Sequence, residues 1–200
     1  MKKILSLLLC AVLLAGVTCG FTGCAAKTEI NEKNITAAVE KTASALQEFD
    51  TKTLGKYVDS KTLGVIIPVA EKNEAFLKLG SAMFAHLTVE IVRIDVDAAT
   101  VTVKVNNKDL YADASAFAYE LNSHYSKMEL LGLLNNQSFI DENLNPLIEK
   151  IEAAPMKSEA QEITLKVTQG KRNLVLGFDD AAEDAVSGGA LGAIKSVFGV

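Results

Sequence analysis

One histidine of this 200-residue chain stands directly beside a tyrosine, and this pair is the first candidate for acid–base chemistry. His124 and Tyr125 lie in a segment with helical periodicity. Histidine can exchange a proton near neutral pH, which is what a general acid or base needs. We prefer the simpler interpretation that Tyr125 packs in the core and His124 points to water. The other histidine, His86, falls near the end of an expected helix, where an imidazolium would suit the helix dipole.

Metal and nucleotide chemistry find little support in the sequence. Asp179-Asp180 and Glu183-Asp184 gather four carboxylates, but a calcium loop needs oxygen ligands at alternating positions and a bidentate glutamate. We therefore expect a helix cap and solvated charges there. Ser187-Gly188-Gly189 lacks the ending of a phosphate loop, and a helix break explains its glycines. No motif indicates a cofactor or a metal, and we predict no catalytic residue.

The thiols are confined to the start of the chain. The three cysteines are Cys10, Cys19 and Cys24. The sequence after Cys24 therefore has no thiol that could form a disulfide, attack a substrate or bind zinc. The two histidines are also too few for a multi-histidine metal site.

The first 26 residues have the pattern of an export signal. Two lysines precede an uncharged run over residues 4–26, which ends in small residues. Phe21-Thr22-Gly23-Cys24 resembles the lipobox of bacterial lipoproteins. That resemblance implies cleavage before Cys24 and a diacylglycerol on its thiol, which supplies the two acyl chains that stable anchoring requires. Two alternatives remain: the run is long enough to stay as an uncleaved span, or an ordinary signal is cut near Ala26 and the protein is released.

These patterns divide the chain into three parts. We predict a lipoprotein signal peptide over 1–23, a polar tether over 24–33 and a single domain over 34–200. The net charge is −5, and loss of Lys2 and Lys3 with the signal makes it −7. An acidic protein of this kind is a poor match for nucleic acid or for electrostatic docking on anionic lipid. We expect an exported protein that covalent lipid anchors to the outer face of the cell membrane.

The order of hydrophobic patterns predicts an α+β fold. Apolar residues at helical spacing predict helices that begin near Asn34, Asp50, Asn73, Asp109, Asn143 and Ala190. Alternating residues predict strands over 88–96, 100–105, 162–167 and 173–178. Between the first helices, the segment over 60–69 should be a turn or a bent helix that ends before Pro68, and Pro146 should fit the first turn of its helix. Two hairpins then form an antiparallel sheet with helices on one face, and a helical insert over 110–151 lies between them. The apolar end over 190–200 either packs on the sheet, which we prefer, or offers a surface to a partner.

This order of elements resembles the nuclear-transport-factor-2-like, or cystatin-like, fold, and more closely the small bacterial lipoproteins that carry such a domain. The resemblance rests on residues 39–50 and 56–59 in the first helices, on 99–109 around the second strand, and on 173–180 at the last strand. It implies N-terminal helices on a curved sheet, shaped as a cone with a cavity at its mouth. A fold of this kind does not define a function by itself.

Enzymes of that fold often hold an acidic residue or a tyrosine–aspartate pair in the cone. This would bring Tyr111, Asp113 and Tyr119 together with His124 and Tyr125. No such constellation matches residue by residue, so we predict a non-enzymatic domain that binds a small ligand or a protein at the cell envelope. The alternative is an enzyme that acts on a small apolar substrate in the cone. A third hypothesis is a structural module of the envelope, for example a homodimer through the sheet face.

Overall fold

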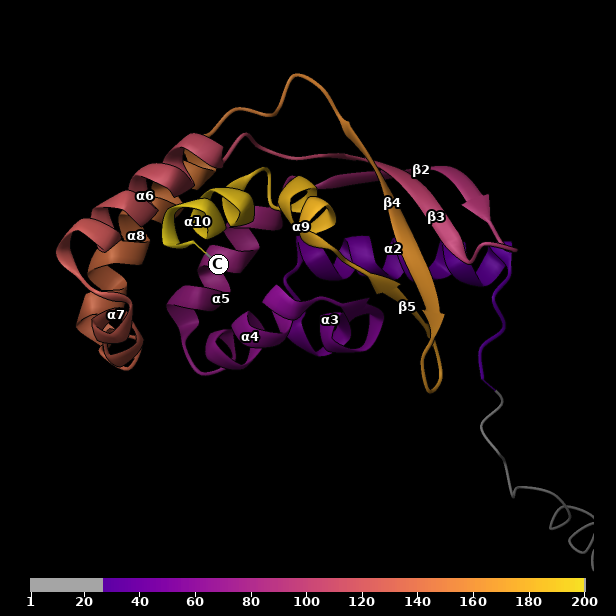
Figure 1. Cartoon of the computed structure of the whole chain (residues 1–200), viewed down its shortest axis with the longest axis horizontal. Coiled ribbons are helices and arrows are strands. Elements are labelled where there is room, and N and C mark those ends of the chain that lie inside the picture. The colour runs from indigo at the N-terminus through magenta and orange to yellow at the C-terminus, as the bar shows by residue number, and fades with distance from the viewer. Residues whose placement is uncertain (1–26, 200) are drawn as a thin grey trace, which may run out of the picture.

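The computed structural model describes residues 27–199, and over them the chain forms an α+β domain, as expected (Figure 1). Its helices are α2 (Glu32–Gln47), α3 (Thr51–Tyr57), α4 (Lys61–Ala70), α5 (Glu74–Phe84), α6 (Tyr111–His124), α7 (Lys127–Leu133), α8 (Gln137–Ala153), α9 (Asp180–Val186) and α10 (Ala190–Phe198). Its strands are β1 (Val58–Asp59), β2 (Thr88–Asp95), β3 (Thr100–Asn106), β4 (Gln161–Gln169) and β5 (Leu174–Gly177). The expected signal over 1–23 and its Cys24 lie outside the described residues. Within them, no helix combines the length and the apolar character that a membrane crossing requires.

The strands form one open, mixed sheet in the order β1-β5-β4-β3-β2. Both expected hairpins are present, and the two join through antiparallel pairing of β3 with β4. The expectation of a purely antiparallel sheet is wrong at one edge, because Val58 and Asp59 run parallel to β5 opposite Leu176 and Gly177. A strand of two residues has no alternation that a sequence pattern could reveal.

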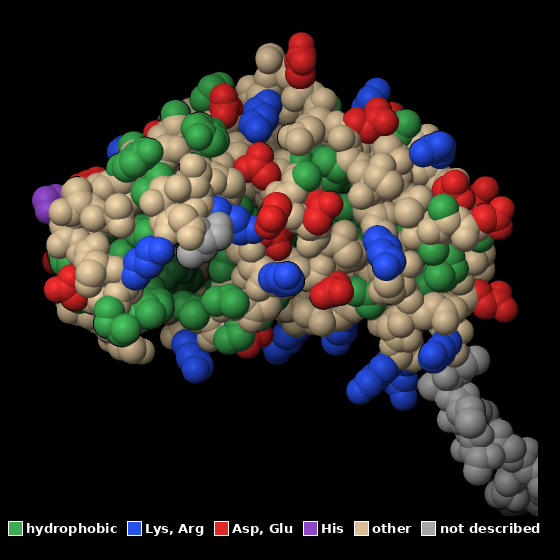
Figure 2. All heavy atoms as spheres, viewed as in Figure 1, with side chains coloured by type: hydrophobic (Ala, Val, Ile, Leu, Met, Phe, Trp, Pro, Cys, Tyr) green, Lys and Arg blue, Asp and Glu red, His purple; other side chains and the backbone are tan. Residues whose placement is uncertain are grey.

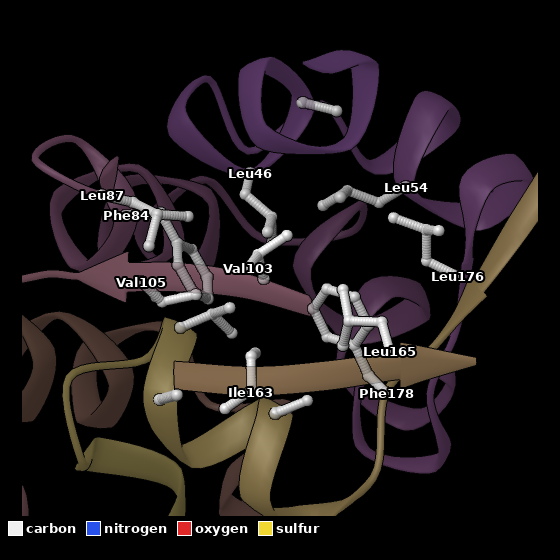
Figure 3. Close-up of a cluster of buried hydrophobic side chains, with 14 of the residues drawn as sticks. Leu46, Leu54, Phe84, Leu87, Val103, Val105, Ile163, Leu165, Leu176 and Phe178 are labelled. Atoms are coloured by element: carbon white, nitrogen blue, oxygen red, sulfur yellow. The ribbon is translucent and has the colours of Figure 1, made fainter. Parts of the chain in front are cut away.

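One face of the sheet is buried against α2. Val101 and Val103 of β3 stand opposite Leu165 and Ile163 of β4, and all four side chains are buried. Figure 3 shows Leu46 of α2 directed toward Val103, so that the helix covers these buried side chains of the sheet. Burial of each such side chain stabilises the fold by about 1.5–3 kcal/mol. The alternation that predicted the strand over 100–105 thus corresponds to a buried face with Val101, Val103 and Val105.

Several helix boundaries differ from the expected ones. Asn31, not Asn34, caps α2, because its side chain accepts a hydrogen bond from the backbone N–H of Asn34 at 2.9 Å. The prediction that the segment over 60–69 ends before Pro68 is wrong, since α4 runs through Pro68 to Ala70. At this position proline removes one backbone hydrogen bond of the helix, which then ends two residues later.

The long helix expected from Asp109 is in fact two helices. Leu110, which offers no side-chain hydrogen bond, occupies the cap position of α6, and α6 ends at His124. Ser126 and Glu129 then form a reciprocal capping box that starts α7. Pro146 lies inside α8 rather than in its first turn, because Asn136 starts this helix earlier than expected.

A buried polar side chain joins the C-terminal ends of α5 and α9. Asn107 follows β3 and is 1% exposed. Its amide donates hydrogen bonds to the carbonyl oxygens of Met83 at 3.0 Å and Val186 at 2.7 Å, at the C-terminal ends of α5 and α9. These bonds satisfy two carbonyl groups that the helix ends leave without a partner.

The remaining helices pack mainly on one another. α5 packs on α8, and α10 packs on α6 rather than on the sheet as expected. In Figure 1 these helices, with α4 and α7, form the left half of the molecule, beside the sheet. The segment expected as an insert thus combines with α5 and α10 into a helical half.

Candidate functional site

The helical half encloses a cavity of about 190 Å³. Its wall comes from α4, α5, α6, α8 and α10, with Phe49 at the end of α2. Every described residue that lines it is apolar or glycine. Figure 2 shows hydrophobic side chains gathered around a hollow between α10 and α4, at the left of the view. The cavity is therefore walled by helices, whereas the sequence led us to expect one at the mouth of the sheet.

Helical periodicity places these side chains. Leu144, Leu147 and Ile151 of α8 line the cavity at spacings of three and four residues, as do Leu191 and Ile194 of α10. Residues three and four apart share one face of a helix. The sequence predicted a helix from about Asn143, and the apolar spacing within it forms the face that α8 turns inward. The sequence did not reveal that the apolar faces leave a space between them.

Phe49 and Gly80 shape the floor of the cavity together. Phe49 has a positive φ of 49°, which turns the chain sharply after α2. Its ring stacks on Phe84, with ring centres 5.9 Å apart, and lies against the backbone of Gly80. The ring can occupy this position because residue 80 has no side chain.

The cavity suits an apolar group of limited size. An engineered cavity of about 150 Å³ with an apolar wall stays dry and binds benzene, so this one has room for roughly eight carbon atoms. Pockets for drug-sized molecules are larger, about 300–1,000 Å³. A polar group placed inside would lose its hydrogen bonds to water and find no partner in the wall, at a cost of about 1–3 kcal/mol. A ligand with a polar end must therefore keep that end outside.

The residues considered for acid–base chemistry lie elsewhere. Tyr111 and Tyr119 on α6 are 53% and 63% exposed, and Asp113 is half-buried in the first turn of the same helix. None of them lines the cavity. α6 faces the cavity with Ala114 and Phe117 instead. The structure thus does not bring these three side chains together at a pocket.

The histidines also lie outside the cavity. His124 is exposed at the end of α6, as expected. Tyr125 is half-buried and packs edge-on against Phe139, with ring centres 5.3 Å apart. His86 is exposed just after α5. Over residues 27–199, no three histidine, cysteine or acidic side chains are grouped so that they could hold a metal ion.

The acidic group at residues 179–184 has one buried member. Glu183 is 2% exposed and accepts hydrogen bonds from the hydroxyl groups of Ser60 and Thr62. Lys195 of α10 donates to it at 2.6 Å and also pairs with Asp180. The expectation of solvated charges is therefore wrong for Glu183. The network ties α9 to α4 and α10, two helices of the cavity wall.

Hydrogen bonding decides the charge state of this pair. Burial raises the pKa of Glu183, but the hydrogen bonds from Lys195, Ser60 and Thr62 together outweigh it and lower the pKa below its ordinary value. The hydrogen bonds to Asp180 and then Glu183 raise the pKa of Lys195. Both groups are therefore charged at neutral pH.

The neighbouring predictions are confirmed. Asp179 caps α9, since its side chain accepts a hydrogen bond from the backbone N–H of Ala182 at 2.9 Å. Gly188 and Gly189 interrupt the helical path between α9 and α10, with positive φ values of 63° and 92°. A Cβ atom on Gly188 would overlap the carbonyl oxygen of Lys108, so this position also requires glycine for space.

Comparison with known proteins adds no further constraint. No family model, no curated protein and no solved structure matches the chain. Function is therefore inferred from the cavity, its apolar wall and the pattern of the first 26 residues.

Proposed function

We propose that the protein is exported, held at the outer face of the cell membrane by lipid on Cys24, and binds the apolar part of a small ligand in its helical cavity. The observation that carries this proposal is the cavity of about 190 Å³ with an entirely apolar wall among the described residues. The ligand would be bound and released without chemical change. No described side chain of the wall can donate, accept or exchange a proton, which favours binding over the alternative of an enzyme for a small apolar substrate.

The hydrophobic effect defines the class of ligand. Each buried methylene group contributes about 0.8 kcal/mol, which is about fourfold in affinity. A straight chain or a single ring of roughly eight carbons fills the space, by comparison with the benzene-binding cavity. Its polar end, if it has one, remains in water at the surface between α10 and α4, where Figure 2 shows the hollow.

We also propose that the sheet and its N-terminal helices form a cystatin-like cone. The packing of α2 against β2 and β5 across one face of the sheet supports this shape. The proposal assigns ligand binding to the helical half and gives the sheet a supporting role, because Phe49 joins α2 to the cavity floor. A cavity on the sheet face itself is not required.

The methionines provide a direct test of binding. Met83 lines the cavity, whereas Met128 and Met156 are 78% and 42% exposed. With methyl-labelled methionine in the full chain, held in bilayer discs, we would titrate straight-chain primary alcohols from butanol to dodecanol and follow the methyl resonances. We expect Met83 alone of these three to shift, with affinity for free alcohol rising about fourfold per methylene until the cavity is full.

Matched variants distinguish cavity binding from general effects of alcohol. Leu144→Phe adds volume inside the cavity, so the rise in affinity should stop at a shorter alcohol. Leu131→Phe makes the same change on α7, where Leu131 is 62% exposed. It should leave the dependence of affinity on alcohol length unchanged. A Met83 resonance that does not respond, or that responds alike in both variants, would overturn the binding proposal.

Lipid attachment has its own test. Labelled palmitate should be incorporated into the protein in a bacterial host, and Cys24→Ala should abolish the label. Cys19→Ala serves as the matched control and should retain it. Label that persists in the Cys24 variant would contradict the anchor and leave the cavity proposal to be judged by the methionine experiment.

A further inference from the structure

A basic surface lies at the end of the molecule where the described chain begins. Lys27, Lys171 and Arg172 border one shallow hollow together with Gln169 and Gly170. All three charged side chains are exposed. Figure 2 shows Lys and Arg side chains beside the grey trace at the lower right, far from the hydrophobic hollow at the left.

Hydrogen bonds hold this surface in shape. The side chain of Gln169 donates to the carbonyl oxygen of Thr28 at 3.1 Å, which fixes the start of the described chain on the end of β4. The backbone N–H of Gly170 donates to the carbonyl oxygen of Asn173 at 2.8 Å and closes the turn between β4 and β5. The side chain of Asn173 in turn donates to the carbonyl oxygen of Lys56 at 2.7 Å.

The positive charge of this basic surface is not neutralised locally. Neither Lys27 nor Lys171 nor Arg172 forms an ion pair with a carboxylate of the described residues. Glu29 is the only acidic residue between Lys27 and the start of α2, and the turn over 169–173 has none. A cluster of exposed positive charge in a chain of net charge −5 points to an anionic partner.

We propose that this basic surface binds the anionic headgroups of the membrane. The inference rests on the proposed lipid attachment at Cys24, but not on ligand binding in the cavity. Lys27 follows Cys24 by three residues, and three residues span at most about 11 Å. A lipid on Cys24 would thus hold Lys27 within about one Debye length of the headgroups. Lys171 and Arg172 border the same hollow as Lys27, so they reach the same layer.

This placement changes the expectation drawn from the overall charge. The acidic total predicts repulsion from anionic lipid, but over the last few ångströms the local charge decides. Each basic side chain near an anionic surface favours contact by about fivefold. Lipid on Cys24 would supply the attachment, and the basic surface would fix how the domain stands on the membrane.

Lysine labelling on the full chain tests the inference. We would reconstitute the protein in vesicles of phosphatidylcholine alone or with about 30% phosphatidylglycerol, acetylate briefly and measure each lysine by mass spectrometry. We expect Lys27 and Lys171 to react at least fivefold more slowly in the anionic vesicles, and to recover in about 0.5 M salt. Exposed Lys72 and Lys127, in the helical half, are the reference sites and should react equally in both.

A pair of charge reversals controls for general electrostatics. Arg172→Glu should remove most of the protection of Lys171, whereas Lys72→Glu, with the same change in net charge, should not. Equal reactivity in the two kinds of vesicle would overturn the inference while leaving the anchor intact. Protection by inorganic phosphate in solution would assign the surface to a free anion instead of the membrane. Failure of the chain to remain with the vesicles would overturn the inference and the proposed location together.

Discussion

The ring of Phe49 lies against the backbone of Gly80, so that a Cβ atom at residue 80 would be 2.4 Å from two of its ring carbons. The two residues come from α5 and from the turn after α2, and they meet at the floor of the cavity. This contact links the packing of the first helices to the space available for a ligand.

Gly80→Ala should destabilise the protein although alanine favours helices. The methyl group would displace the Phe49 ring from its stack on Phe84, which we expect to cost about 1–3 kcal/mol. The gain in helix propensity offsets about 1 kcal/mol of this. Gly64→Ala in α4, where nothing lies within 4 Å of an added Cβ, should instead stabilise by up to about 1 kcal/mol. Urea unfolding of both variants checks the prediction, and stabilisation by both would contradict it.

The buried pair Glu183–Lys195 should give stability a defined pH dependence. The fold lowers the pKa of Glu183, so its contribution is complete above the ordinary carboxyl pKa and is lost as pH falls through the lower, folded value. The pKa of Lys195 is raised, so its contribution is complete below the ordinary lysine pKa and is lost as pH rises through the folded value. Urea unfolding from acid to neutral pH should therefore show a fall in stability on the acid side.

Glu183→Gln should remove that acid-side change. It should also lower the free energy of unfolding at pH 7 by about 3 kcal/mol, because it breaks a buried pair and leaves Lys195 only Asp180. Glu159→Gln, at an exposed position in the loop before β4, is the matched control and should have little effect. If the stability of Glu183→Gln still fell at acid pH as in the unmodified protein, the pH dependence would belong to other carboxylates.

Asn107→Ala should be among the more damaging single substitutions. It would leave the carbonyl groups of Met83 and Val186 without their buried partner, at a cost of about 2–4 kcal/mol. Asn122→Ala on the exposed face of α6 should be nearly neutral. Thermal unfolding followed by circular dichroism provides the comparison, and similar midpoints for the two variants would contradict this account.

Helix α7 should exchange its amide hydrogens faster than α5 and α8. None of its residues is buried, and elements with little buried surface open most readily. Ser126→Ala, which removes the capping box, should speed exchange in α7 without changing global unfolding. Hydrogen exchange with mass spectrometry reads both effects. Protection of α7 that grows with protein concentration would show instead that a second copy covers Met128 and Leu131.

Local patterns predicted the elements better than their ends. The β-branched alternation of residues 101–105 identified β3 because the signal lies within the strand itself. The end of α6 was missed because Tyr125 and Ser126 interrupt a helix whose apolar spacing continues across them. Two-residue β1 has no internal pattern and depends wholly on its neighbour β5.

The candidate site was hidden from the sequence for a different reason. The spacing of Leu144, Leu147 and Ile151 shows an inward face, but the volume left between five helices depends on how all of them pack. The contact of Glu183 with Ser60 joins positions 123 residues apart, and no local rule pairs them. Residue types therefore indicated an apolar interior, while the fold alone determined where it stays open.

In Figure 1 the described chain begins at the right of the view, whereas the helices that line the cavity lie in its left half. A protein tethered to a bilayer by its N-terminus would therefore carry its receptor end outward, into the aqueous space beyond the headgroups. Small apolar compounds diffusing in from the surroundings would meet that end first. On the proposed function, this arrangement favours a ligand that arrives from solution over a lipid taken from the same leaflet.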